Sequence, residues 1–170
     1  MTIHRIRRPS FLNKLIAEQA IQAAVKTAFA TLPVKRQMLH VVVLAPQYSG
    51  DEHYPCNEPK PFILAELSFG DKTQWPHPFD EVARKKAQQR WYDRSDGGSV
   101  KPHLLLPGDT PFWGSAKRDE LVAAASGVEP WGDLAVASMT IDLCLALSYY
   151  AFAAWKSQHE GDDFLPHPLA

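Results

Sequence analysis

The chain has 170 residues, a mass of 19.0 kDa and a formal net charge of −1. Its length suits one domain, and its 45% hydrophobic residues exclude a chain that is disordered by composition. The balanced charge excludes a nucleic-acid binder that works through bulk positive charge, and two cysteines exclude a disulfide framework and a four-cysteine zinc site. We expect one domain over residues 1–170, with a core from about 10 to 157 and a tail over 158–170.

The N-terminal segment does not have the pattern of a secretory signal. Arg5, Arg7 and Arg8 supply positive charge, but Asn13 and Lys14 interrupt the apolar run that should follow. We therefore predict a cytoplasmic protein with reduced thiols.

A first helix is predicted after Pro9, with Ser10 as its N-cap, and it ends near Thr31, before Pro33. Several small or apolar residues recur at helical spacing and define its predicted inner face: Leu12, Leu15, Ile16, Ala20, Ala23 and Thr27. The many alanines in this segment would let the helix approach a sheet closely.

Two strands are predicted next. The run from Met38 to Ala45 is short, apolar and rich in β-branched residues, which is typical of a buried strand, and Pro46 should end it. The stretch from Gln47 to Lys60 is rich in proline and predicts a loop. Phe62 to Phe69 alternates weakly in hydropathy and predicts a second strand, antiparallel to the first.

A second helix is predicted from Phe79 to about Trp91, because apolar residues recur there at helical spacing. Asp80 and Glu81 fall in its first turn, where negative charge favours the helix dipole. Short strands are then predicted at 103–106 and at 121–126, on either side of a loop that contains proline and glycine.

The last predicted helix begins between Pro130 and Asp133 and runs to about Ser157. From Leu134 to Trp155 the one formal charge is Asp142, so the segment is long and apolar enough to span a bilayer. A charge near the middle of a span costs about 2.5–3.5 kcal/mol. We therefore predict a helix that packs on a sheet or against a second subunit, with no membrane partner.

The order of predicted elements is helix, two strands, helix, two or three strands, helix. Strands that follow one another directly favour an antiparallel sheet over a parallel one. The sequence thus predicts an α+β fold, with an antiparallel sheet of about five strands and flanking helices.

Four segments, in this order, are similar to one protein family. An alanine-rich helix leads into the strand at 40–45, and Ala83-Arg84-Lys85-Lys86-Ala87 resembles an A-x-x-K-A motif on a second helix. A loop at 107–111 precedes the last hairpin, and the strand at 121–126 ends in Ser-Gly shortly before Asp133. On these segments the chain resembles the GlcG/HbpS-like family, the haem-binding or haem-degrading domain. The enlarged loop at 47–60 and the glutamine at position 88 depart from the family pattern.

The resemblance implies a profilin-like sandwich that forms homo-oligomers. It also implies haem or a related small ligand as the cofactor. Lys86 corresponds to the lysine of the family motif and is the first candidate for a ligand contact.

The residues themselves suggest where a ligand would bind, between the sheet and the loops. Lys86, Arg84 and Arg90 would favour an anionic group such as a haem propionate. The alternative is that this basic run is an ordinary solvated helix face. Trp75 and Trp113, beside proline or glycine in loops, would floor a pocket or anchor an interface, or else cover the ends of the sheet. Ser126, which ends the last predicted strand, is a further candidate for a ligand contact.

One loop combines residue types that bind metals. His53 and Cys56 are candidate ligands for zinc, copper or a haem iron, but no second His/Cys pair has suitable spacing. An incidental loop is the alternative. The sequence has no nucleophile elbow, Walker loop or dinucleotide fingerprint.

Three functional hypotheses follow from these patterns. The first is a small oligomeric ligand-binding domain with no defined catalytic activity. The second is a metal-dependent or thiol enzyme that uses His53 and Cys56. The third is an interaction module, in which loop tryptophans and the long apolar helix build a subunit contact.

Overall fold

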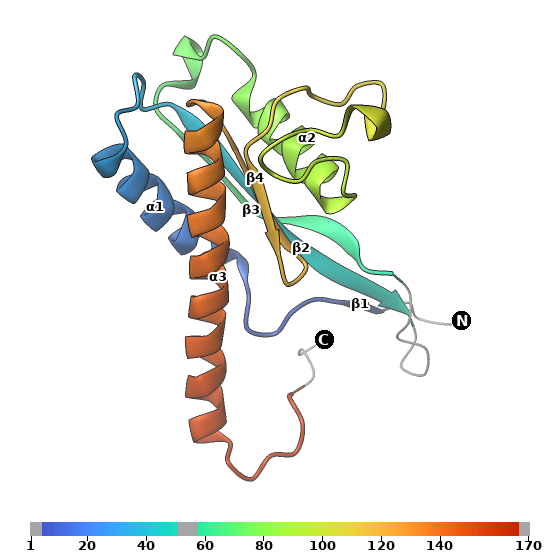
Figure 1. Ribbon diagram of the computed structural model, residues 1–170. Helices are drawn as coiled ribbons and strands as arrows, with labels where there is room; N and C mark the ends of the chain where they lie inside the picture. The colour runs from blue at the N-terminus through green and yellow to red at the C-terminus, as the bar shows by residue number, and fades with distance from the viewer. Residues whose placement is uncertain (1–4, 51–57, 167–170) are drawn as a thin grey trace.

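The computed structural model describes residues 5–50 and 58–166. A single twisted sheet lies between helices, with α1 and α3 on one face and α2 on the other (Figure 1). In chain order the elements are β1 (Arg5–Arg7), α1 (Lys14–Thr31), β2 (Leu39–Gly50), β3 (Lys60–Phe69), α2 (Phe79–Trp91), β4 (Ser115–Arg118), β5 (Leu121–Ser126) and α3 (Pro130–Gln158), with short 3-10 helices at Lys72–Gln74 and Pro102–Leu104.

The sheet is antiparallel at every pairing between its named strands. The long strand β2 pairs with β3, β5 and β1, while β4 pairs with β5. This confirms the predicted α+β class with a five-stranded antiparallel sheet and flanking helices.

Successive side chains of a strand point to opposite faces of the sheet, and here each face has its own core. Val41 and Val43 of β2 are buried against α1 and α3. Val42 and Leu44 are buried against Ala83 and Ala87 of α2. The predicted run of consecutive apolar residues in this strand therefore reflects burial on both sides.

The start and the inner face of α1 differ from the prediction. Asn13, not Ser10, is the N-cap, and its side chain accepts a hydrogen bond from the Ile16 N–H at 3.0 Å. Leu15 is 73% exposed, and Ala23 and Thr27 are exposed as well. The helix buries the following residues, of which Ala20 belongs to the predicted face: Ala17, Ala20, Ile21, Ala24, Val25 and Ala28. In so alanine-rich a helix the hydrophobic pattern defines the buried face only weakly.

Two predictions for the strands were wrong. Residues 103–106 do not form a strand, since Pro102–Leu104 is a 3-10 helix; the strand that pairs with β5 is β4. Pro46 does not end β2, which continues to Gly50. Pro46 lies opposite Pro61 of β3, in the part of β2 beyond its pairing with β5. Proline is tolerated there because the strand has lost one of its neighbours.

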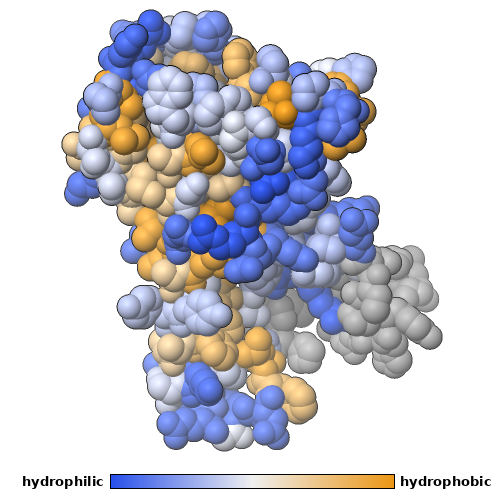
Figure 2. All heavy atoms as spheres, viewed as in Figure 1, coloured by the Kyte–Doolittle hydropathy of each residue, from blue (hydrophilic) through white to orange (hydrophobic). Residues whose placement is uncertain are grey.

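The bounds of α3 agree with the prediction, but its two halves lie in different surroundings. Val136, Ile141 and Cys144 of the first half are buried in the core. The second half extends beyond the sheet, where Tyr149 and Tyr150 are 74% and 76% exposed (Figure 1). Apolar surface covers parts of this helix, interrupted by hydrophilic surface near its middle and at its lower end (Figure 2). Among the described residues, α3 is the one helix with the length and composition of a membrane span.

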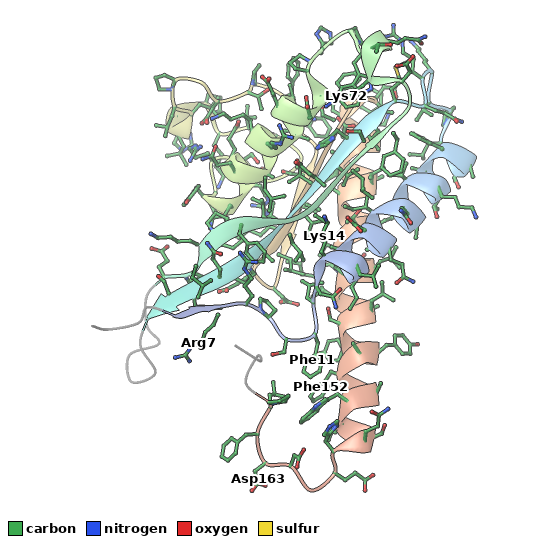
Figure 3. All side chains as sticks on the ribbon, turned by 180° about the vertical axis from the view of Figure 1, so that it is seen from behind. Arg7, Phe11, Lys14, Lys72, Phe152 and Asp163 are labelled. Carbon is green, nitrogen blue, oxygen red and sulfur yellow. The ribbon has the colours of Figure 1, made fainter. Side chains whose placement is uncertain are left out.

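Asp142, the one charged residue between Leu134 and Trp155, is exposed and forms an ion pair with Arg118 of β4. Its charge therefore lies outside the core, as a carboxylate in an apolar helix requires. Near the end of α3, Phe152 packs edge-on against Phe11, with ring centroids 5.4 Å apart (Figure 3). The segment before α1 thus supports the projecting half of α3 on one side.

Candidate ligand-binding site

The most distinctive polar contact joins α2 to α3. Lys86 is only 3% exposed, because its neighbours Ala83 and Ala87 hold this side of α2 against the sheet. Its Nζ donates one hydrogen bond to Asp133 Oδ2 and one to the Ala125 carbonyl oxygen, both at 2.8 Å. Lys86 therefore connects the helix on one face of the sheet to the start of the helix on the other.

The Ala125 carbonyl is available because the N–H of Gly114, the residue opposite it, donates to the Gly97 carbonyl instead. The Ala125 N–H donates to the Gly114 carbonyl, which precedes the first residue of β4. The N–H and C=O of one strand residue point toward the same neighbour, so this carbonyl faces the space before β4. Lys86 supplies the donor that the Gly114 N–H does not.

Asp133 is held from several directions. It lies in the first turn of α3, where the helix dipole favours a carboxylate, and its Oδ1 accepts the Val128 N–H at 3.2 Å. Gly114 makes room for it, because a Cβ at that position would lie 2.5 Å from the Asp133 Cβ. Gly114 also has φ +123°, which side chains rarely adopt.

Burial dominates the electrostatics of this pair. It raises the pKa of Asp133 to about 7, although the ammonium of Lys86 acts in the opposite direction. It likewise lowers the pKa of Lys86, against the attraction of Asp133. The raised pKa of Asp133 means that the stability it contributes is fully present below its usual pKa and is lost as pH rises through about 7.

A cleft of about 470 Å³ opens beside this pair, and both Lys86 and Asp133 contribute to its wall. Most of the lining is apolar: Pro76, Phe79, Val82, Phe112, Trp113, Val128 and Pro130. The cleft lies between α2, the loop before β4 and the turn from β5 to α3. A cleft of this size that combines apolar walls with polar side chains has the character of a small-molecule site.

The charges around the cleft are unequal. Lys35 and Arg36, from the loop between α1 and β2, and His77, from the loop before α2, are exposed and line it. Among the described lining residues, Glu129 and Asp133 are acidic, and Asp133 is already bonded to Lys86. The unpaired excess at the mouth of the cleft is thus positive.

Of the residues predicted to bind a ligand, Lys86, Trp113 and Ser126 line this cleft. Trp75 lies just behind the wall, with its ring centroid 5.2 Å from that of Phe79. Arg84 and Arg90 do not line it. Besides Lys86, the cations that line the cleft are Lys35 and Arg36, and no sequence pattern singled them out.

Arg84 has a structural role in this arrangement. Its guanidinium makes two hydrogen bonds to Glu66, at 2.8 and 3.1 Å. Glu66 also contacts His40 Nε2 at 3.2 Å, and His40 Nδ1 lies 2.8 Å from Ser68 Oγ. His40 is buried, and its pKa is lowered chiefly by that burial. His40 is therefore a buried histidine whose two ring nitrogens both have partners.

Arg90 is likewise hydrogen-bonded within the protein, since its Nη1 donates to the Ser95 carbonyl oxygen at 3.1 Å.

The loop that carries Phe112 and Trp113 is anchored by two contacts. Gln89, fully buried, exchanges two hydrogen bonds with the backbone of Thr110, at 2.8 and 3.0 Å. Arg94 makes a two-pronged ion pair with Asp109. These contacts hold the aromatic wall of the cleft in place.

The predicted metal ligands, His53 and Cys56, lie outside the described residues. Within residues 5–50 and 58–166, no group of three or more His, Cys, Asp or Glu side chains is arranged to hold a metal ion. Cys144 is buried in α3, and burial raises the pKa of its thiol to about 12, as expected of an inert thiol.

Comparison with family models, with curated proteins and with solved structures finds no match to this chain.

Removing either member of the buried pair should destabilise the protein strongly. We expect K86M and D133L each to lower the free energy of unfolding by about 3–5 kcal/mol, because each leaves one buried group without its partner. The double variant K86M/D133L should lose less than the sum of the two. Urea unfolding measures all four proteins.

The exposed pair Arg118–Asp142 is the matched control. R118M and D142L should each change the free energy of unfolding by less than about 1 kcal/mol. Additive effects of K86M and D133L would contradict the pairing.

Proposed function

We propose that the protein is a small-molecule-binding domain of the GlcG/HbpS type and that its ligand occupies the cleft beside Lys86 and Asp133. The observation that carries the proposal is the cleft itself, since it combines an apolar wall with a positive mouth. Its volume of about 470 Å³ lies in the usual range of small-molecule sites, roughly 300–1,000 Å³.

The lining suggests the chemistry of the ligand. A flat apolar body would lie against Phe79, Phe112 and Trp113, and an anionic group would face Lys35 and Arg36. Lys35 and Arg36 are adjacent and exposed, so an acidic group reaches them without burying their charge. We therefore favour an amphipathic carboxylic acid over a neutral or cationic ligand.

Haem is an amphipathic carboxylic acid, and the residue types that line the cleft suit such a ligand. Haem requires an apolar slot, an axial ligand and cations for its propionates. The apolar wall would take the macrocycle, His77 would supply an imidazole, and Lys35 and Arg36 would pair with the propionates. Bound haem would supply a redox-active iron.

The Lys86–Asp133 pair supports the proposed relationship to the GlcG/HbpS-like family as well as the proposed binding site. Lys86 and Asp133 come from two of the four segments on which the resemblance rests, and they form one ion pair. A profilin-like arrangement of the sheet and a haem-type ligand are the further consequences of that kinship.

The proposal predicts tight binding of haemin and of metal-free protoporphyrin to the purified protein. Haemin should shift the Soret band, and H77A should remove the part of the shift that depends on iron ligation. K35A/R36A should weaken the binding of both porphyrins about fivefold or more, since each lost charge contact contributes on the order of 1 kcal/mol. K85A, which removes a lysine outside the cleft, is the matched control.

Haemin that binds while protoporphyrin does not would show that iron ligation alone drives binding. If both porphyrins bind and neither K35A/R36A nor W113A changes their affinity, the ligand binds outside this cleft. No spectral change at micromolar concentrations of either porphyrin would contradict the haem version of the proposal.

We also propose that the chain forms homo-oligomers through the projecting half of α3. From Leu143 to Trp155 this helix carries no charged residue, and Tyr149, Tyr150 and Phe152 are exposed. A second copy presents the same uncharged surface, with alanines at 146, 151, 153 and 154 that allow close approach of two helices.

Sedimentation in detergent-free buffer tests this assembly. We expect a species larger than the 19.0 kDa chain, which Y149E/Y150E converts to monomer because two buried carboxylates would be unpaired. A wild-type monomer, or a chain that needs detergent or vesicles to remain in solution, would contradict it.

A further inference from the structure

Lys86 has the surroundings of an amine that reacts with a carbonyl group. Its Nζ lies 2.8 Å from a carboxylate oxygen and contributes to the wall of the cleft, while the side chain is 3% exposed. We infer that Lys86 forms a Schiff base with an aldehyde or ketone acid bound in the cleft and that Asp133 carries the proton for this step. The inference rests on the proposed function and narrows its ligand class.

The geometry distinguishes Lys86 from other lysines nearby. An ammonium group has three N–H donors, and two of them are used by Asp133 and by the Ala125 carbonyl. Lys85, the next residue, and Lys35, at the mouth of the cleft, are exposed to water. A lysine in a desolvated site loses its proton more readily than an exposed lysine does, and burial lowers the pKa of Lys86.

Asp133 is suited to move the proton. Burial raises its pKa to about 7, so proton transfer from the ammonium to the carboxylate, across one hydrogen bond, gives a neutral amine beside a carboxylic acid. No third residue is needed to produce the nucleophile.

The condensation balances with these two groups alone. The Lys86 amine attacks the carbonyl carbon, a C–N bond forms, and an amine proton passes to the oxygen to give a carbinolamine. The carboxylic acid of Asp133 then protonates the hydroxyl group, water leaves, and a C=N bond results. The products are a protonated imine on Lys86, the Asp133 carboxylate beside it, and one water; nothing is oxidised or reduced.

The cleft also explains why the carbonyl compound should be an acid. Lys35 and Arg36 line the cleft and are exposed, Lys86 lines it and is buried, and aromatic side chains contribute to the same lining. A molecule with a carboxylate at one end, a carbonyl at the other and an apolar body matches all three.

The experiment uses 4-carboxybenzaldehyde with sodium cyanoborohydride, which reduces an imine to a stable secondary amine. Intact-mass spectrometry should show one added carboxybenzyl group per chain, and peptide mapping should place it on Lys86. K86R keeps the positive charge but cannot form the imine, so the label should be lost. K85R should be labelled as the wild type is, and D133N should be labelled more slowly.

Calorimetry without the reductant separates this inference from the proposed function. Binding of 4-carboxybenzaldehyde and of benzoate that K35A/R36A weakens, with no label on Lys86, would overturn the Schiff base and leave the binding site intact. No binding of either compound, with no label, would overturn both. Label on Lys35 or Lys85 instead of Lys86 also overturns the inference, and this reading does not depend on whether K86R folds.

Discussion

Two buried charges meet where α2, the end of β5 and the start of α3 converge. Taking an ammonium and a carboxylate out of water costs several kcal/mol each, so this contact persists only because each charge has further hydrogen bonds. Lys86 has the Ala125 carbonyl and Asp133 has the Val128 N–H. Gly114 allows the approach, and its N–H, which donates to Gly97, leaves the Ala125 carbonyl available. Together, these hydrogen bonds and the glycine at position 114 hold the Lys86–Asp133 pair in the wall of the cleft.

The Lys86–Asp133 pair also helps to fix the position of α2 on the sheet. α2 packs on the sheet through Ala83 and Ala87, and Arg84 bonds to Glu66 of β3. Small apolar contacts alone would fix the position of such a helix poorly. The charged hydrogen bond from Lys86, near the middle of α2, fixes the register of this helix relative to α3, while Gln89 and Arg94 fix the loop that follows it. The cleft walls are therefore held by directional bonds rather than by close packing.

Much of the architecture could be predicted from the sequence. The double-sided burial of β2 and the strong helical signal of α3 led to the correct fold class and the correct bounds for α3. The face of α1 and the position of β4 could not be predicted, because alanine-rich and short segments carry little periodic signal. Lys86 was selected by resemblance, but its partner lies 47 residues away and no local pattern links them. Lys35 and Arg36 were missed because only the tertiary fold brings an exposed loop to the cleft.

The direct test of this account is an experimental structure of the full chain at a resolution that defines side chains. It should place Lys86 Nζ within hydrogen-bonding distance of Asp133, close to the 2.8 Å found here, with the cleft open beside the pair. A Lys86 side chain that extends into solvent, or a packed core in place of the cleft, would contradict the account.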